Sequence, residues 1–510
     1  MRLRRAVRNS FSSVGAYLLL AALGFLVRKL FLQYFDLSYL GYEGLFGSTF
    51  TILSVMEMGA GSMFTYLLYS AIEKDDREEI SAIMSMFRQL YQGIGLLVIG
   101  VGLVLYVCLP YIITESVENW TYVRIIFLVQ MLVSVSTYFL AYRRVLLLAD
   151  QCEYLVIRIE TFFRILGVLS KIAVIVWLQN YLVYILVTFF TNVLANLAVY
   201  GSCKRRYPYL KRVKVMPADY KEKKIDREMR SLIIHKLSAT IYSSADNIII
   251  SALCGIRTVG LFSNYTLINT NVMNLVVKTL QPLEASVGNK VNASTVEENI
   301  SFYKGYDLFC RMLALFTFVG FSVMLQPVLA WFYGDAYLLP YGMVIAMAAN
   351  NYIAVRQYAV TAYRNALGHY EIDRNSRIAS AVCNIVISIA AGTLTGISGI
   401  LFATAVGHCF IWYGRVKAVG RIYLQDRSFV RRTFVQEIPG FLLGLAEVVL
   451  CMGACMRMPV SFGGILGRLA VCCIVPNLLN LCLFHKAEGM ETIRQYASQI
   501  IAQVMRRKDV

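Results

Sequence analysis

The sequence predicts an all-α protein that crosses a membrane about fourteen times. Its 510 residues are 58% hydrophobic, its mean hydropathy is +0.59, and only 16% of the residues are charged, against about 25% in soluble domains. Apolar runs of about 20 residues, each long enough to cross a hydrocarbon core of about 30 Å, recur along the whole chain. These observations indicate a polytopic membrane protein, since an aqueous fold could not bury so much apolar surface.

The predicted helices follow one another with short connections. The first apolar run is too long for a signal peptide and no small-residue cleavage site follows it, so we expect it to be kept as the first helix. We expect helices near residues 12–35, 44–70, 84–113, 122–148, 155–178, 181–203, 231–253, 258–288, 303–333, 341–367, 377–396, 399–421, 434–457 and 464–485.

The basic residues predict the orientation in the membrane. Of the 49 Lys and Arg, we assign 40 to one side of these helices, 3 to the other side and 6 to the predicted spans, and the positive-inside rule places the first side, with both termini, in the cytosol. The densest basic block, residues 204–230, predicts a cytosolic linker that can also touch anionic lipid headgroups. The net charge of +18 is thereby explained without nucleic acid as a partner. The external connections are too short to hold a catalytic domain.

Two weak repeats indicate a duplicated architecture. The letters "AYRR" begin at Ala141 and "AYRN" begins at Ala362, each at the cytosolic end of a predicted helix, and Gly41 aligns with Gly260 in a second match. Both matches join helices that are six apart, at offsets of 221 and 219 positions. Parallel repeats of this kind are typical of transporters that bind substrate between two lobes. We therefore predict an N-lobe over 1–203, the linker 204–230, a C-lobe over 231–425, two further helices within 426–485 and a cytosolic tail, 486–510.

Polar residues form stripes on several of the predicted helices. An ionisable group within a span costs about 2.5–3.5 kcal/mol on insertion scales, so each needs a partner or a wet cavity. Residues that recur every three or four positions share one helix face. The predicted cavity lining consists of Asn247, Asn264, Asn271, Asn274, Gln281, Asn350 and Gln357, with the cations Arg28, Lys278 and Arg356 and the acids Glu57 and Asp246.

The charges in these stripes favour an anionic cargo. Arg28, Lys278 and Arg356 lie deeper than a side chain easily snorkels, and we expect them to face a water-filled cavity. Arginine can clamp a phosphate through two hydrogen bonds, so the cargo is expected to carry phosphate or carboxylate. Glu57 and Asp246 allow two interpretations: a site coupled to protons or sodium ions, or counter-ions for neighbouring cations. Single Ser and Thr residues are better explained as contacts between helices.

Signals for an enzyme or a metal site are missing from the sequence. There is no GxxxxGK[ST], GxSxG or HExxH motif. The twelve cysteines lie mostly in apolar runs and show neither a CxxC motif nor a Cys/His spacing suited to zinc. We therefore predict neither an enzymatic activity nor a metal or organic cofactor.

Several segments resemble a known family. They include "RKLFLQYFDLSYLGYEGLF" (28–46), "HKLSATIYSSADNIIISALCGIRTVGLFSNYTLI" (235–268) and "RNALGHYEIDRN" (364–375). These resemble the polysaccharide-biosynthesis flippases, the O-antigen and capsule repeat-unit transporters of the multidrug/oligosaccharidyl-lipid/polysaccharide superfamily. The resemblance covers nearly the whole chain, and it is more specific in helices seven, eight and ten to twelve than in the last two.

The resemblance implies a V-shaped transporter of two six-helix lobes in the bacterial cytoplasmic membrane. Such a protein flips undecaprenyl-pyrophosphate-linked oligosaccharide to the outer leaflet by alternating access, for capsule, O-antigen-like or exopolysaccharide assembly. Arg28, Lys278 and Arg356 are the positions that match the family's cationic lining. The resemblance also implies coupling to protons or sodium ions, contact with membrane lipids, and a polysaccharide polymerase and glycosyltransferases as pathway partners.

Two other cargoes stay open. A lipid II flippase for peptidoglycan belongs to the same superfamily and would need a cationic cavity as well. A multidrug and toxin extrusion antiporter shares the fold, but Arg and Lys within the spans argue against a cationic drug as cargo. A membrane-bound polymerase or ligase would carry its catalytic residues on a long outer loop, which the predicted topology lacks.

Overall fold

The computed structural model describes most of the chain. The described residues are 20–113, 115, 117–214, 240, 244–293, 296–366, 373–422, 428–495 and 498. Within them nearly all regular structure is α-helical, as the composition predicts, and the expected all-α fold class is confirmed.

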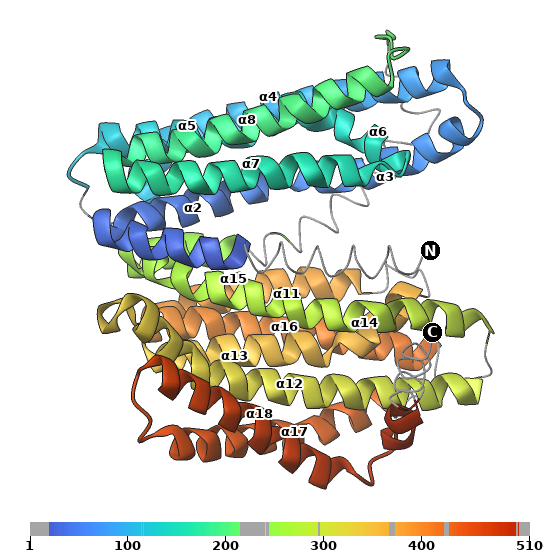
Figure 1. The fold of residues 1–510 in the computed structure, drawn as a ribbon. Helices are drawn as coiled ribbons and strands as arrows, with labels where there is room; N and C mark the ends of the chain where they lie inside the picture. Colours follow the sequence, from blue (N-terminus) through green and yellow to red (C-terminus); the bar gives the residue numbers. More distant parts are fainter. Residues whose placement is uncertain are drawn as a thin grey trace, which may run out of the picture. The chain divides into compact units, whose positions relative to one another are not determined.

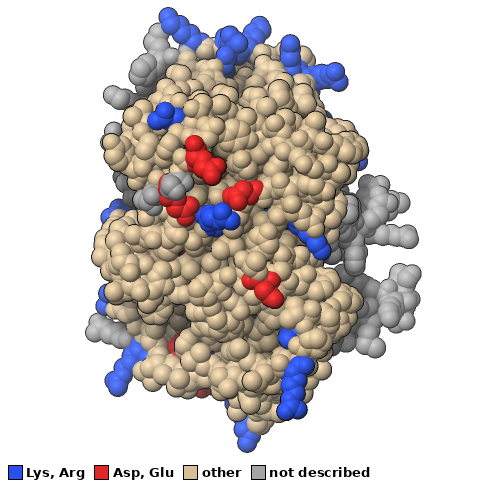
Figure 2. All heavy atoms as spheres, turned by 90° about the vertical axis from the view of Figure 1, so that its left-hand side faces the viewer, with Lys and Arg blue, Asp and Glu red and all other residues tan. Residues whose placement is uncertain are grey.

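Many of the described helices are suited to cross a membrane. By length and composition, nine described helices qualify: Arg77–Ile112, Trp120–Ala149, Glu153–Leu178, Tyr181–Arg206, Glu297–Tyr333, Arg374–Thr395, Ile397–Ile422, Phe429–Cys455 and Phe462–Phe484. Figure 2 shows one face of the molecule, on which uncharged residues predominate and acidic and basic side chains are few. The protein is a multi-pass membrane protein.

The first of two compact units comprises Met1–Ser263. Here α5 packs against α2, α4 and α8, and α7 packs against α8 (Figure 1). Asp and Asn side chains accept hydrogen bonds from the first backbone amides of α2, α4, α5 and α8, which are the usual N-cap interactions. Its helices are 20–34, α2 (Leu37–Leu53), α3 (Val55–Glu73), α4 (Arg77–Ile112), α5 (Trp120–Leu140), α6 (Arg144–Ala149), α7 (Glu153–Ala173), α8 (Tyr181–Arg206), Ser244–Cys254 and the start of α11 (Ile256–Ala293).

The second unit comprises Asn264–Val510 and is built around α12. That helix packs against α13, α17 and α18. The next pair, α15 and α16, forms a tight antiparallel hairpin (Figure 1). The hairpin turns at Gly396, whose φ is +62°, a conformation that favours glycine. Besides the rest of α11, its helices are α12 (Val296–Tyr333), α13 (Tyr341–Arg356), α14 (Tyr358–Ala366), α15 (Arg374–Thr395), α16 (Ile397–Ile422), α17 (Phe429–Cys455) and α18 (Phe462–Phe484).

Three helices that the sequence predicts as continuous are interrupted in the structure. The predicted span 44–70 begins earlier, at Leu37, and breaks at Ser54; the span 122–148 passes through a 3₁₀ turn at 141–143; and the span 341–367 breaks at Gln357. At the first break the hydroxyls of Thr51 and Ser54 donate to backbone carbonyls of the preceding turn. Such bonds compete with the helical ladder and favour a bend, and hydropathy does not detect them.

The chain divides into its two compact units between Ser263 and Asn264, and the predicted lobes stay a prediction. We expected the second lobe to begin at residue 231, but the helix Ser244–Cys254 belongs to the first unit. The reason is local, because Asn247 in this helix bonds to α2. Of the basic linker, residues 204–214 are described, and the backbone amides of Lys211 and Val213 donate to serine hydroxyls of α4. Residues 215–230 of the linker lie outside the described part of the chain.

Candidate functional site

Two helices of the first unit cross at a pair of glycines. A Cβ added to Gly41 of α2 would lie 2.1 Å from the carbonyl oxygen of Ile256, and one added to Gly260 of α11 would lie 2.5 Å from the carbonyl oxygen of Leu37. Only glycine permits backbones to approach so closely. Leu37 and Ile256, like Gly41 and Gly260, are 219 positions apart. Exchanging the two repeats therefore maps one contact onto the other, which is a local two-fold relation that supports the predicted duplication.

A second pair of contacts has the same reciprocity and contains two predicted site residues. Nη1 of Arg28 donates to Oγ of Ser263 over 2.9 Å, and Nδ2 of Asn247 donates to the carbonyl oxygen of Gly44 over 3.3 Å. Arg28 and Asn247 are separated by 219 positions, as are Gly44 and Ser263. Asn247 also donates to Oγ of Ser48 over 2.8 Å. The structure thus brings Arg28 and Asn247 to equivalent places on either side of the glycine crossing.

Charged residues that the sequence analysis did not single out lie near Arg28. Lys171 of α7 lies over the ring of Tyr184, with its Nζ 4.6 Å from the ring centroid, and Glu43 and Arg28 are near enough to act on its charge. The stretch "LGVLSKIAVIVW" that contains Lys171 was a usable signal, because a lysine interrupts an otherwise apolar span. The position of Glu43 depends on the packing of α2, which hydropathy does not give.

The first unit contains a cavity beside this group. Its volume is about 330 Å³, and it lies between α2, α5 and α8. Glu43 is the charged residue of its described lining, and Thr51, Ser54, Gln130, Ser134 and Thr188 add uncharged polar groups beside Gly47, Phe50, Val133 and Ile185. Water in such a cavity would find several hydrogen-bonding partners, so the carboxylate of Glu43 borders a partly polar cavity.

The polar stripe predicted on α11 falls into two parts in the structure. Asn264 is fully buried, and neither its amide nitrogen nor its amide oxygen has a hydrogen-bond partner in the described structure. Further along, Nδ2 of Asn271 donates to the carbonyl oxygen of Leu267, whereas the side chains of Asn274, Lys278 and Gln281 are exposed within their unit. The shared cavity lining and the roles of these residues in cargo binding stay predictions.

Arg356 lies in a compact charged cluster of the second unit. Only 1% of its side chain is exposed; Nη1 and Nη2 donate to both oxygens of Asp307 over 2.5 and 2.9 Å, and Nε donates to Glu437 over 2.8 Å. The hydroxyl of Tyr352 also donates to Glu437, and Nη2 of Arg311 lies 3.5 Å from it. We predicted that Arg356 faces a cavity and binds cargo; the structure pairs its guanidinium with two carboxylates and also places it in the lining of a cavity, and cargo binding by Arg356 stays a prediction. Its two acidic partners come from α12 and α17, far away in sequence.

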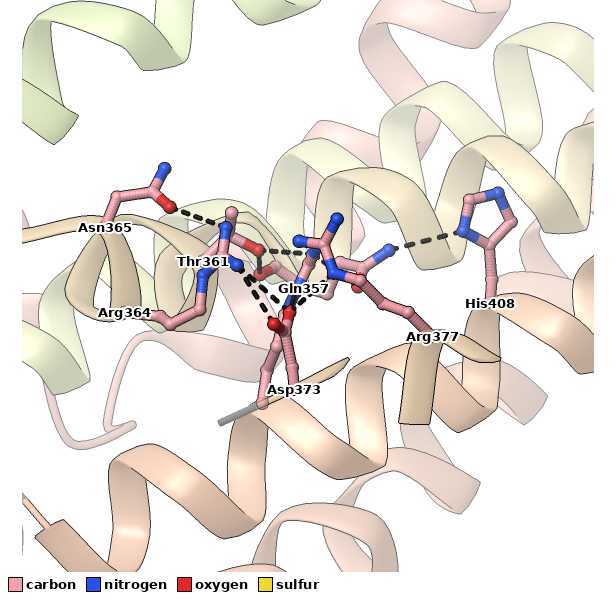
Figure 3. A network of polar contacts seen from close by, with 8 residues as sticks. Gln357, Thr361, Arg364, Asn365, Asp373, Arg377 and His408 are labelled. Carbon is pink, nitrogen blue, oxygen red and sulfur yellow. Dashed lines mark hydrogen bonds and ion pairs between the residues drawn. The ribbon is translucent and has the colours of Figure 1, made fainter. Parts of the chain in front are cut away.

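A second network surrounds one aspartate at the start of α15 (Figure 3). Asp373 is fully buried and accepts from Nη1 of Arg364 over 3.1 Å, Nε of Arg377 over 3.0 Å and Nε of Arg415 over 3.1 Å. Burial alone would raise the pKa of the Asp373 carboxyl, but the three guanidinium groups outweigh it and hold that pKa below its ordinary value.

The predicted lining residue Gln357 belongs to the same network (Figure 3). Its Oε1 accepts from Nη1 of Arg415 over 3.0 Å, and its Nε2 lies 3.4 Å from Nδ1 of His408. Nη1 of Arg415 also donates to the hydroxyl of Thr361. The network links the break in the α13–α14 segment to α15 and α16, so Gln357 holds helices together here.

The repeated "AYR" motif has different partners in the two halves. Arg364 contacts Asp373, whereas the guanidinium of Arg143 lies over the ring of Tyr200, 4.0 Å from its centroid. Yet an aspartate follows each motif in the sequence. Asp373, after the second motif, is buried, and Asp150, after the first, is half-buried and accepts from the hydroxyl of Tyr207 over 2.5 Å. Both copies of the motif are thus followed by acidic residues that we did not single out, and their location on the cytosolic side stays a prediction.

The other predicted site residues have separate surroundings. Nδ2 of Asn350 donates to the carbonyl oxygen of Leu401, which ties α13 to α16, and Asp246 is half-buried. Glu57 lies in α3, but its side chain is outside the described part. Among the described residues no group of His, Cys, Asp and Glu side chains is arranged to hold a metal ion.

The fold is shared with solved structures of membrane transporters. Neither a family model nor a curated protein matches the sequence. The chain is similar to a lipid II flippase, MurJ, in an inward closed conformation, with a TM-score of 0.68, 13% identity, and coverage of 92% of this chain and 98% of that one.

Multidrug transporters of the MATE family are also similar. An inward-facing member of the MOP superfamily gives a TM-score of 0.56, 14% identity, and coverage of 81% of this chain and 95% of that one. The MATE multidrug transporter DinF-BH gives a TM-score of 0.56, 15% identity, and coverage of 82% of this chain and 95% of that one. At these identities the comparisons establish the fold, which carries flippases and transporters.

Proposed function

We propose that the protein is a flippase that moves a lipid-linked oligosaccharide with a diphosphate link across the bacterial cytoplasmic membrane by alternating access. The observation that carries this proposal is the reciprocal glycine crossing between α2 and α11, on a fold that it shares with a flippase. The oligosaccharide would serve surface polysaccharide assembly. Glycosyltransferases would act before the transfer, and a polymerase would act after it.

The glycine crossing has the properties of a gate. Gly41 is the fifth residue of α2 and Gly260 the fifth of α11, and the predicted topology puts both helix starts on the outer side. The crossing depends on close backbone packing at two glycines, and an exposed ion pair between Asp36 and Arg257, at 3.5 Å, also joins the two helix starts. Such a contact can separate and re-form as a unit when a transporter exchanges access between the two sides.

The charges near the crossing support an anionic cargo. Arg28 carries five N–H donors, and the structure assigns one of them to the neutral hydroxyl of Ser263. Among the described carboxylates none is within ion-pair distance of Arg28, so its charge is available to a phosphate. Lys171 supplies a second cation in the same unit, and the carboxylate of Glu43 lies near enough to interact with its charge. A diphosphate would satisfy these donors better than a cationic drug.

A lipid II flippase is the second candidate, and one observation favours it. The MurJ structure matches more of the chain, with a higher TM-score, than the MATE structures do. The two candidates share the diphosphate chemistry and differ in the glycan that is attached. The charge pattern of Arg28 and Lys171 serves either one, so the cargo has to be distinguished by the lipid intermediate that accumulates.

Coupling to a proton or sodium gradient is part of the proposal. Glu43 beside a polar cavity and Asp246, one residue before Asn247, are acidic groups close to the crossing in the first unit. Dissipating one gradient at a time in cells or vesicles should identify the ion, because transport should stop with only one of the two. Unchanged transport without either gradient would contradict coupling.

A deletion strain provides the test in cells. Loss of the protein should remove surface polysaccharide and leave lipid-linked glycan on the cytosolic leaflet. Wild type and Lys29→Gln should restore export, because Lys29 is exposed, whereas Arg28→Gln should not. Normal export in a deletion strain without a redundant transporter would overturn the proposal. Growth arrest with accumulated peptidoglycan precursor would favour the lipid II candidate instead.

A further inference from the structure

The second unit contains a cavity that the transport proposal does not use. Its volume is about 720 Å³, within the range of sites for small molecules. It lies between the first part of α12, the first part of α17 and the turn that follows α18, with Phe429 and Phe484 in its wall. By the predicted topology these ends of the three helices lie on the cytosolic side of the membrane.

The cavity has a basic side with a weakly compensated arginine. Nε of Arg311 is buried and has no hydrogen-bond partner in the described structure, and its Nη2 is 3.5 Å from a carboxylate oxygen of Glu437. That same oxygen accepts from Nε of Arg356 at the shorter distance of 2.8 Å. Glu437 is therefore shared, and Arg311 keeps donors for another anion.

The cavity is bordered by charged side chains of both signs. The described carboxylates are Asp307, Glu437 and Glu488, and the described cations are Lys304, Arg311, Arg356 and Arg432. Lys304 and Glu488 pair at 2.7 Å, and both side chains are well exposed, so this pair is weak. Arg311 is therefore a cation with donors left for an anion that enters the cavity.

Apolar residues also line the cavity. They are Ile300, Leu308, Phe429, Pro439, Phe484 and Ala487, beside the uncharged polar residues Tyr303, Thr433 and Gln436. An inorganic anion would make no use of the apolar lining, because it has no apolar part to bury. A lipid would use both kinds of lining, with its phosphate on the arginines and its glycerol and first acyl carbons against apolar side chains.

The described part of the tail covers the cavity on one side. Residues 485–489 turn after α18, and Gly489 has a φ of +98°. A Cβ on Gly489 would lie 2.5 Å from the carbonyl oxygen of Lys304, and one on Gly305 would lie 2.8 Å from Thr492. This close approach seats the tail against α12 and makes the cavity a built feature of the unit.

We propose that this cavity binds the headgroup of an anionic phospholipid from the inner leaflet, with Arg311 as the principal phosphate ligand. A guanidinium binds phosphate through paired, charge-assisted hydrogen bonds, and basic pockets between membrane helices on the cytosolic side suit anionic headgroups. The inference goes beyond the proposed function, since it concerns a resident lipid and does not depend on the identity of the cargo.

Native mass spectrometry of the purified full-length protein tests this proposal. Phosphatidylglycerol should bind about tenfold more tightly than phosphatidylcholine, because only the former has a net negative headgroup. Arg311→Gln should lose about tenfold in phosphatidylglycerol affinity, and Arg311→Lys should lose less. Arg431→Gln is the matched control, because Arg431 is exposed on the same turn of α17 as the lining residue Arg432 but is not among the lining residues of the cavity. The Arg431→Gln variant should bind phosphatidylglycerol with the affinity of the wild type.

The same measurements can overturn the proposal. Equal binding of the two lipids, or wild-type affinity in Arg311→Gln, would exclude a phosphate site at Arg311. Displacement of phosphatidylglycerol by millimolar inorganic phosphate would indicate a site for a free anion. Displacement by undecaprenyl diphosphate would assign the cavity to a diphosphate cargo. Either result contradicts a resident phospholipid. If Arg311→Gln does not fold, Arg311→Lys decides: a reduced phosphatidylglycerol affinity supports the proposal, and an unchanged one refutes it.

Discussion

Replacing Gly41 by alanine should weaken the glycine crossing without unfolding the protein. The added Cβ would lie 2.1 Å from the carbonyl oxygen of Ile256, whereas ordinary contacts begin at 3.4 Å, so α2 and α11 must separate by about 1.3 Å. Overpacking of this kind typically costs about 1–3 kcal/mol. This energy corresponds to a decrease of about 5- to 150-fold in the occupancy of the closed crossing. The helix itself gains about 0.5–1 kcal/mol from the loss of glycine.

Distances between two spin labels measure this change. In a variant without native cysteines, Glu118→Cys and Leu253→Cys place labels at exposed positions of the first unit, near the starts of α5 and α11, and leave the ion pair of Asp36 and Arg257 intact. Gly41→Ala should increase the population of long distances and lower the transport rate. Gly100→Ala on α4 is the matched control, because nothing lies within 4 Å of the added Cβ, and it should leave the distances unchanged.

The reciprocal position gives a second check of the same reasoning. Gly260→Ala should act in the same direction as Gly41→Ala, with a smaller effect, since its Cβ would lie 2.5 Å from the nearest carbonyl oxygen. If both variants keep the wild-type distance distribution and transport rate, the crossing is not a gate, and the argument from close packing is refuted.

Three further predictions concern the buried charges of the second unit. Asp307→Asn should destabilise the protein by about 3–5 kcal/mol, because it leaves the guanidinium of Arg356 with one carboxylate; thermal melting in detergent measures this, and the exposed Asp335→Asn should show little change. Arg356→Lys should also lower the melting temperature, though less than Arg356→Ala, since lysine keeps the charge but loses the bidentate geometry; equal losses would contradict this. Asp373 should contribute stability that is complete above its ordinary pKa of 3.8 and is lost as the pH falls through the lower folded value; in Asp373→Asn the melting temperature should be lower and depend less on pH in this range.

Properties that depend on local composition and periodicity were predicted well from the sequence. The all-α membrane fold follows from hydropathy alone, and the alignment of Gly41 with Gly260 gave an offset that the structure reproduces in two reciprocal contacts. Repeats survive in sequence where close packing restricts the residue, and a glycine at a backbone crossing is such a place. Arg28 and Asn247 are related by the same offset of 219 positions.

Properties that depend on partners far away in the chain could not be predicted. The charge of Arg356 was visible in the sequence, but its neutralisation by Asp307 and Glu437 depends on how α12 and α17 pack against α13. Asp373 is a similar case, because Arg415 reaches it from the far end of the α15–α16 hairpin. The breaks at Ser54 and Gln357 were missed because hydropathy is blind to hydrogen bonds between side chains and the backbone.

Reconstitution into liposomes tests the central claim most directly. Purified protein is inserted into vesicles that carry a fluorescent undecaprenyl-diphosphate-linked oligosaccharide, and an impermeant reagent reports how much of it is exposed at the outer leaflet. We predict that vesicles with wild-type protein or Lys29→Gln expose the inner pool of this lipid, and that Arg28→Gln vesicles do so much more slowly. Equal rates in protein-free and wild-type vesicles, under an imposed proton gradient and under a sodium gradient, would contradict the proposed flippase.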